Sequence, residues 1–157
     1  MRIGHDQRPL LFLDIDGTLL PFGAAGDSHL DRLDPGTGPR LAALPCTLVW
    51  ATTWENEANT ELAPRLGLSP LPVVRWPDPS AEHEHEDRWF GLHWKTRSLV
   101  AWAAGRPFIW VDDELTDADR EWVATHHHGR ALLHRVAPSR GLLAEDIPVL
   151  DRWLRTP

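Results

Sequence analysis

Cysteine is almost missing from this sequence, since Cys46 is the only one among 157 residues. A single thiol excludes an intramolecular disulfide and any metal site built from paired cysteines. Long apolar runs are missing too: no stretch approaches the roughly 20 residues needed to cross a bilayer, and the first residues lack the apolar segment of a secretory signal. We therefore expect a cytoplasmic protein.

Positive charge is also scarce. The chain carries 16 Lys and Arg against 23 Asp and Glu, which gives a formal net charge of -7, and Lys95 is its single lysine. Broad contact with phosphate backbones or anionic lipid needs clustered Lys and Arg. We therefore expect neither bulk nucleic-acid binding nor a membrane partner.

Apolar runs and helical patterns alternate along the chain, and its length suits a single domain with one core. Such alternation is typical of an α/β fold with a parallel sheet. The predicted strands are residues 10–13, 46–50, 108–111 and 131–136. The predicted helices are residues 55–66, 93–104, 116–126 and 143–154, the last one interrupted or restarted near Pro148.

Two segments lack either pattern and are predicted to be long loops. Residues 21–40 are rich in Gly, Pro and Asp, and residues 69–88 carry four prolines and the stretch EHEHED. Long loops in a compact domain are usually functional or mobile. The histidines of EHEHED and of residues 126–128 lack the spacing of a zinc site, so we interpret them as a solvated loop and a helix end.

Acidic and hydroxyl side chains follow three of the predicted strands. Ligands of open parallel sheets bind outside the carboxyl ends of the strands, so these side chains should converge. Gly17, in a turn after the first strand, should expose backbone N–H groups that suit a phosphate. The converging residues are Asp14 and Asp16 after the first strand, Thr52 and Thr53 after the second, and Asp112 and Asp113 after the third.

Four carboxylates in one crevice repel one another unless a cation neutralises them, and a set of oxygen ligands suits Mg²⁺. Each motif has a plainer explanation, because a DxD sequence also forms turns and an Asp pair after a strand also caps helices. Lys95 is a further candidate, because a compact ammonium can bridge a carboxylate and a phosphoryl oxygen.

The motif DIDGTL (residues 14–19), a threonine after the second strand, Lys95 and the later acidic pair follow one another in the order of a known family. In these features the chain resembles the haloacid dehalogenase (HAD) superfamily of phosphatases and phosphotransferases. The resemblance implies a HAD-like three-layer α/β/α sandwich around a central parallel sheet, as a single domain over residues 1–157. The intervals between the motifs are too short for a full cap domain.

The resemblance also implies a role for each motif residue. Asp14 would be the nucleophile that forms an aspartyl-phosphate, and Asp16 the general acid and base. Thr52, with Thr53 as the alternative, would hold the phosphoryl group, and Lys95 would neutralise it.

Magnesium would be the cofactor that the resemblance implies. The side chains of Asp14 and Asp113 and the backbone carbonyl of Asp16 would bind it, with Asp112 and Asp117 in supporting positions.

These roles imply a Mg²⁺-dependent phosphatase rather than a dehalogenase, because dehalogenases of the superfamily lack an aspartate two residues after the nucleophile. The substrate would be a phosphorylated small molecule or an exposed phosphorylated group on a macromolecule, and the negative net charge argues against a nucleic-acid end. A HAD scaffold that binds ligands with little turnover stays open as an alternative.

The motif order excludes a two-component receiver domain. Trp54 is interpreted as a core anchor rather than a substrate contact.

Overall fold

The computed structural model describes residues 8–22, 29–78 and 80–157. Residues 23–28, part of the first predicted loop, lie outside the described residues. A four-stranded parallel sheet in the order β2-β1-β3-β4 forms the centre of the described chain. The strands are β1 (Leu10–Leu13), β2 (Thr47–Trp50), β3 (Phe108–Asp112) and β4 (Ala131–Arg135).

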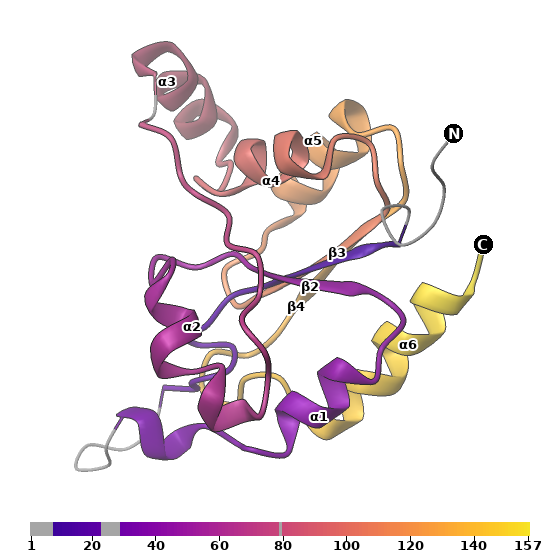
Figure 1. Ribbon diagram of the computed structural model, residues 1–157. Helices are drawn as coiled ribbons and strands as arrows, with labels where there is room; N and C mark the ends of the chain where they lie inside the picture. The colour runs from indigo at the N-terminus through magenta and orange to yellow at the C-terminus, as the bar shows by residue number, and fades with distance from the viewer. Residues whose placement is uncertain (1–7, 23–28, 79) are drawn as a thin grey trace.

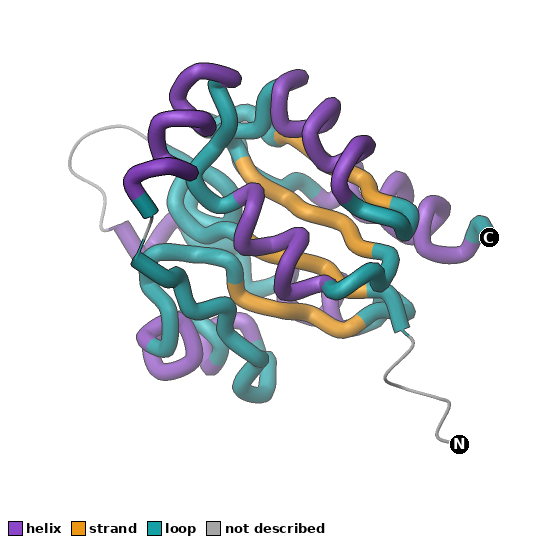
Figure 2. The backbone as a smooth tube through the Cα atoms, turned by 90° about the horizontal axis from the view of Figure 1, so that it is seen from above, coloured by secondary structure: helices purple, strands orange, loops and turns teal. Residues whose placement is uncertain are grey.

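Helices cover both faces of this sheet (Figure 1), and Figure 2 shows one helical layer lying over the strands. Both side-chain faces of the central strands are therefore buried: Leu11 and Leu13 pack into one core, and Leu10 and Phe12 into the other. One layer contains α1 (Thr37–Ala42), α2 (Glu57–Glu61) and α6 (Ile147–Arg155). The other layer contains α4 (Thr96–Ala103) and α5 (Asp117–His126). Helix α3 (Ala81–Phe90) lies beside this second layer. The predicted α/β/α sandwich is confirmed.

The predicted strands agree with the structure within one residue at their ends, whereas the helical segments differ from the prediction at several places. Residues 55–66 divide into α2 and the 3-10 helix η3 (Pro64–Leu66), because proline disfavours continuation of a helix. The last helix divides as predicted, into the 3-10 helix η4 (Ala144–Asp146) and α6, which has Pro148 in its first turn. The first predicted loop, residues 21–40, contains the 3-10 helix η2 (His29–Arg32) and the first residues of α1.

The second loop prediction is wrong for the EHEHED stretch, which lies in α3. Ser80 caps this helix by accepting a hydrogen bond from the N–H of His83, and acidic residues in the first turn complement the helix dipole. Gly91 ends it with a positive φ of 71°. The helix is therefore specified by its ends, and it buries none of its residues.

The rest of that segment runs along the edge of β2. The backbone N–H of Trp50 donates to the carbonyl of Pro72, and the carbonyl of Trp50 accepts from the N–H of Val74. The chain thus passes beside the sheet from one helical layer to the other. This path brings Trp76 to the end of β2, where its indole N–H donates to the carbonyl of Thr52 at 3.0 Å. No described helix combines the length and the apolar character that a membrane crossing requires.

Gly38 offers a test of how α1 packs. A Cβ atom at this position would collide with the backbone carbonyl of Leu66. Helix propensity alone favours alanine over glycine by about 1 kcal/mol, whereas overpacking costs about 1–3 kcal/mol. We expect Gly38→Ala to lower the free energy of unfolding, measured by urea denaturation.

The matched control is Gly36→Ala at the start of the same helix. The three atoms nearest to its added Cβ would belong to the exposed side chains of Asp34 and Arg40, so we expect a change within about 0.5 kcal/mol. If Gly38→Ala were as stable as the unchanged protein, the described packing of α1 against η3 would be incorrect.

Candidate active site

The predicted site residues converge at the carboxyl ends of β1, β2 and β3. Asp14 follows β1, Thr52 lies two residues after the end of β2, and Asp112 is the last residue of β3. The parallel register pairs Leu13 with both Trp50 and Val111, so the three strands end at the same level. The side chains of all three residues are buried.

Lys95 holds these strand ends together. Its Nζ lies 2.8 Å from Oδ1 of Asp14 and 2.9 Å from Oδ2 of Asp112. The third hydrogen bond goes to the backbone carbonyl of Ala51, at 2.9 Å. Because an ammonium group has three N–H donors, its hydrogen-bonding capacity is filled by contacts to β1, β2 and β3 together.

Burial and charge act against each other in this cluster. Burial would lower the pKa of Lys95, but Asp14 and Asp112 outweigh it and raise that pKa above its usual value. For the two carboxylates burial raises the pKa and Lys95 lowers it. Burial is the larger effect at Asp14, whose pKa is raised, whereas the contacts with Lys95 outweigh burial at Asp112, whose pKa is lowered. The side chain of Lys95 is 4% exposed, so water screens these interactions little.

Asp119 fixes the backbone that carries Lys95. Its Oδ1 accepts hydrogen bonds from the N–H of His93 and the hydroxyl of Thr96, both at 2.8 Å. Its Oδ2 accepts from the N–H and the hydroxyl of Thr116, the N-cap of α5. One fully buried carboxylate thus joins the start of α4 to the start of α5 and sets the position of Lys95.

The turn after β1 orients Asp14. The hydroxyl of Thr18 donates to Oδ2 of Asp14 at 2.9 Å, so each carboxylate oxygen has its own donor. Gly17 adopts a positive φ of 80°, and a Cβ there would collide with the carboxylate of Asp113. The N–H of Gly17 bonds to the carbonyl of Leu20 at 2.8 Å instead of facing a phosphate, so the role we assign to Gly17 is steric.

The two acidic residues after β3 have different surroundings. Asp112 accepts hydrogen bonds from Lys95, from the indole of Trp110 at 3.2 Å and from the N–H of Glu114 at 3.1 Å. Asp113 lies toward Asp14, over Gly17. Asp112 is therefore largely satisfied by the protein, which favours Asp113 as the direct ligand of a cation.

The donor set fits a divalent cation. Carboxylate oxygens of Asp14, Asp112 and Asp113 all lie within 4.8 Å of one another. Burial, together with the neighbouring carboxylates of Asp14 and Asp112, raises the pKa of Asp113 to about 7. A group of three buried carboxylates with a single ammonium has an excess of negative charge, and all-oxygen ligands suit a hard cation such as Mg²⁺. Asp117 lies outside this group: its side chain is 94% exposed and pairs with Arg120.

Asp16 is half-buried at the edge of the cluster and accepts a hydrogen bond from the indole N–H of Trp54 at 3.0 Å. Trp54 also packs against the core, so the predicted anchor role is confirmed and a contact to the candidate acid is added to it. The two threonines considered for holding the phosphoryl group differ in burial, since Thr52 is buried and Thr53 is exposed. Thr52 is therefore the better placed of the two threonines.

His93, which the sequence analysis did not select, borders the site. Its Nδ1 accepts from the N–H of Lys95 at 3.1 Å, so Nε2 carries the proton and faces the carboxylate of Glu114 at 3.2 Å. Ligand atoms of His93, Asp112 and Glu114 also lie within 4.8 Å of one another. Because Asp112 already accepts from three donors, we assign His93 to positioning Lys95.

Comparison with protein families gives a match over residues 10–147 to the family described as "HAD domain in Swiss Army Knife RNA repair proteins". The matched range runs from β1 to the first residue of α6 and includes every site residue described above. Comparison with curated proteins and with solved structures gives no significant match.

The raised pKa of Asp113 predicts how a cation changes stability. Without metal the folded chain keeps this proton up to about pH 7, whereas the ordinary value is 3.8. Between these pH values the folded chain therefore binds more protons than the unfolded chain. The contribution of Asp113 to the free energy of unfolding consequently falls as the pH rises through this range. Mg²⁺ binds the deprotonated group, so we expect it to raise Tm more at pH 8 than at pH 5.

Asp113→Asn is the matched variant, since it keeps the shape of the side chain and removes its charge. We expect a smaller Mg²⁺-dependent rise in Tm at pH 8, and a higher Tm than the unchanged protein in EDTA at that pH. Differential scanning calorimetry measures both. An equal Mg²⁺ effect in the two proteins would exclude Asp113 as a ligand.

Proposed function

The chain belongs to the HAD superfamily, through its match to the HAD domains of Swiss Army Knife RNA repair proteins, and from this premise we propose that it is a phosphomonoester hydrolase. Asp14 would be the nucleophile and would form an aspartyl-phosphate. The observation that carries the proposal is the environment of Asp14: a buried carboxylate whose two oxygens are held by Lys95 and Thr18 at 2.8 and 2.9 Å.

In the first step an oxygen of Asp14 attacks the phosphorus atom while the ester oxygen leaves. Burial raises the pKa of Asp14, and the neighbouring ammonium of Lys95 acts against this by favouring the charged, nucleophilic form of the carboxylate. The positive charge of Lys95 and the hydroxyl of Thr52 would then stabilise the negatively charged phosphoryl oxygens. A transition state of this kind is stabilised mainly by positioning and by neutralised charge, which these fixed groups supply.

Asp16 would donate a proton to the leaving oxygen. In the second step it would take a proton from a water molecule, which attacks the phosphorus atom and frees Asp14. The indole N–H of Trp54 holds one oxygen of Asp16 at 3.0 Å and thereby fixes the direction of the other.

Asp14 and Asp113, with the backbone carbonyl of Asp16 and with Asp112 in support, would hold a Mg²⁺ ion. When bound, that ion supplies positive charge next to the transferring phosphoryl group. The clustering of the three carboxylates supports this assignment.

The description of the matched family supports a terminal phosphate of RNA as the substrate. The net charge of -7 argues against broad contact with a phosphate backbone, so recognition would be confined to the end of a strand. A phosphorylated small molecule is the alternative substrate, and a ligand-binding scaffold without turnover is the alternative function.

The first test is hydrolysis of p-nitrophenyl phosphate by the purified protein. We expect release of phosphate that requires Mg²⁺ and stops with EDTA. Asp14→Asn should lower the rate to background, and Asp16→Asn should lower it by about 10²–10⁴-fold for an alkyl phosphate. Short RNA strands with a 3′- or a 5′-phosphate extend the same assay to the RNA substrate.

Asp117→Asn is the control, because it makes the same chemical change at an exposed aspartate outside the cluster. It should leave the rate unchanged, and thermal unfolding should show all variants folded. Turnover that survives Asp14→Asn would exclude the aspartyl-phosphate mechanism, and a lack of turnover on every substrate would favour the scaffold.

The contact between Trp54 and Asp16 predicts a dependence on the leaving group. Trp54→Phe removes only the indole donor, so it should impair protonation of a poor leaving group. We expect kcat to fall about tenfold for an alkyl phosphate, as for a lost hydrogen bond to a charged group, and to change little for p-nitrophenyl phosphate. An equal loss on both substrates would indicate a merely structural role for Trp54.

A further inference from the structure

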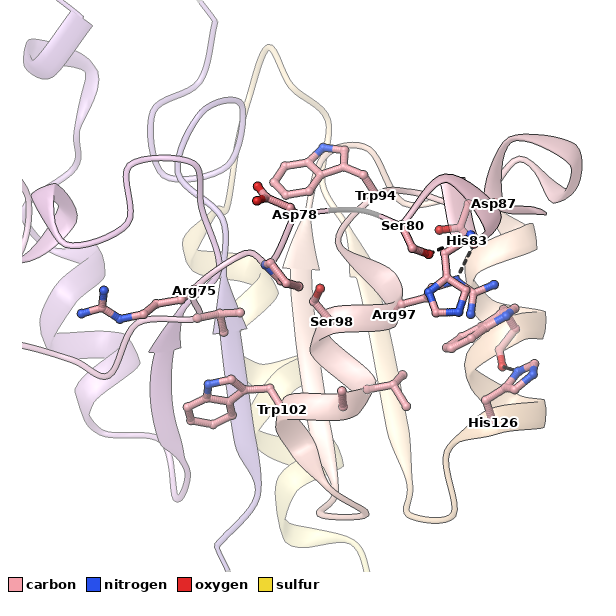
Figure 3. A pocket seen from close by; sticks show the side chains of 15 residues that line it. Arg75, Asp78, Ser80, His83, Asp87, Trp94, Arg97, Ser98, Trp102 and His126 are labelled. Atoms are coloured by element: carbon pink, nitrogen blue, oxygen red, sulfur yellow. Dashed lines mark hydrogen bonds and ion pairs between the residues drawn. The ribbon is translucent and has the colours of Figure 1, made fainter. Parts of the chain in front are cut away.

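A groove outside the catalytic cluster runs along the outer side of α4, between the segment after Val74 and α5 (Figure 3). Its volume of about 740 Å³ lies in the range of small-molecule sites. None of the described catalytic or metal-site candidates lines it. Trp94 and Trp102 both line it, and Ser98 lies between them in Figure 3.

Trp94 connects the groove with the catalytic cluster. Its ring centroid lies 5.6 Å from Nζ of Lys95, the atom that bonds to Asp14. Trp76 packs edge-on against the same ring at 4.9 Å and donates its indole N–H to the carbonyl of Thr52. Lys95, which we propose to neutralise the phosphoryl group, therefore lies against the same indole that lines the groove.

The lining offers aromatic surface but little unbalanced positive charge. Trp94 is 49% exposed and Trp102 is 37% exposed, although both belong to the wall of the groove. Arg97 is already paired with Asp87 at 2.6 Å and with Glu86 at 3.2 Å. The side chain of Arg75 points away from Trp94 and Arg97 in Figure 3.

These properties select a planar, uncharged group rather than a phosphate. Tryptophan surfaces bind nucleobases by stacking, whatever the sequence. Asp78 and Ser98 add an acceptor and a hydroxyl to the lining, which complement the amino groups and ring nitrogens of a base. A charged backbone would gain little here, in agreement with the net charge of the chain.

We propose that this groove binds the nucleobase of the nucleotide whose phosphate occupies the catalytic cluster. The inference rests on the proposed phosphatase function and specifies its substrate as a nucleotide. The nucleotide is either free or the last one of a single strand, and both share the chemistry of a base linked to a phosphate. Trp94 would contact the base next to the phosphoryl group, and Trp102 would line the groove farther along α4.

Equilibrium binding to the Asp14→Asn protein tests the groove without turnover. The probes are a nucleoside 3′-monophosphate and a short single-stranded RNA with a 3′-phosphate, each measured by calorimetry. Trp94→Ala, which removes the aromatic wall, and Ser98→Leu, which fills the groove, should each raise Kd about tenfold. Trp89→Ala is the matched control, because Trp89 is 82% exposed and does not line the groove; it should leave Kd unchanged.

The outcomes separate the groove from the phosphatase function. Loss of binding in both groove variants supports the groove, and does so even if the protein with Asp14 hydrolyses nothing. Unchanged Kd values in both variants overturn the groove, even if p-nitrophenyl phosphate is hydrolysed. If Trp94→Ala raises Kd equally for both probes, a free nucleotide is sufficient for binding to the groove. If it raises Kd for the RNA alone, the ligand is the last nucleotide of a strand.

Discussion

The ammonium of Lys95 is the interaction on which the rest of the site depends. Buried carboxylates from β1 and β3 could not lie so close together without it, and its third hydrogen bond ties the end of β2 to them. Taking these charges out of water costs several kcal/mol per ion, which the structure offsets with short hydrogen bonds on every side. Asp119 supports the arrangement from behind by fixing the turn that carries Lys95.

Much of this could be predicted from the sequence because the physical rules involved are local. Apolar runs with polar residues at their ends predict parallel strands, and parallel strands bring those ends together; hence Asp14, Thr52 and Asp112 were predicted to converge, as they do. α3 was missed because its helix signals lie in its caps, Ser80 and Gly91, while its interior buries nothing. Lys95 was selected for its rarity, and only the structure shows why its position matters.

The contacts that sequence reasoning missed are tertiary. Trp54 lies 38 residues from Asp16 along the chain, and no spacing rule connects them. Asp119 is the third residue of the capping box of α5, as its spacing from Thr116 indicates. Its other carboxylate oxygen accepts a hydrogen bond from Thr96 of α4, which no spacing rule predicts. Gly17 was assigned to phosphate binding because glycine turns often expose N–H groups, whereas this turn satisfies its own N–H and uses the missing side chain to admit Asp113.

Three indole N–H groups hold parts of the site: those of Trp54, Trp76 and Trp110 bond to Asp16, to the carbonyl of Thr52 and to Asp112. An indole is the longest neutral side chain that only donates, so no other residue places a single N–H at the same reach. Tryptophan has a single codon, and no change of one base in it yields another indole. Every point mutation at these codons therefore replaces the indole, so three uncharged residues restrict the sequence of the site together with its charged ones.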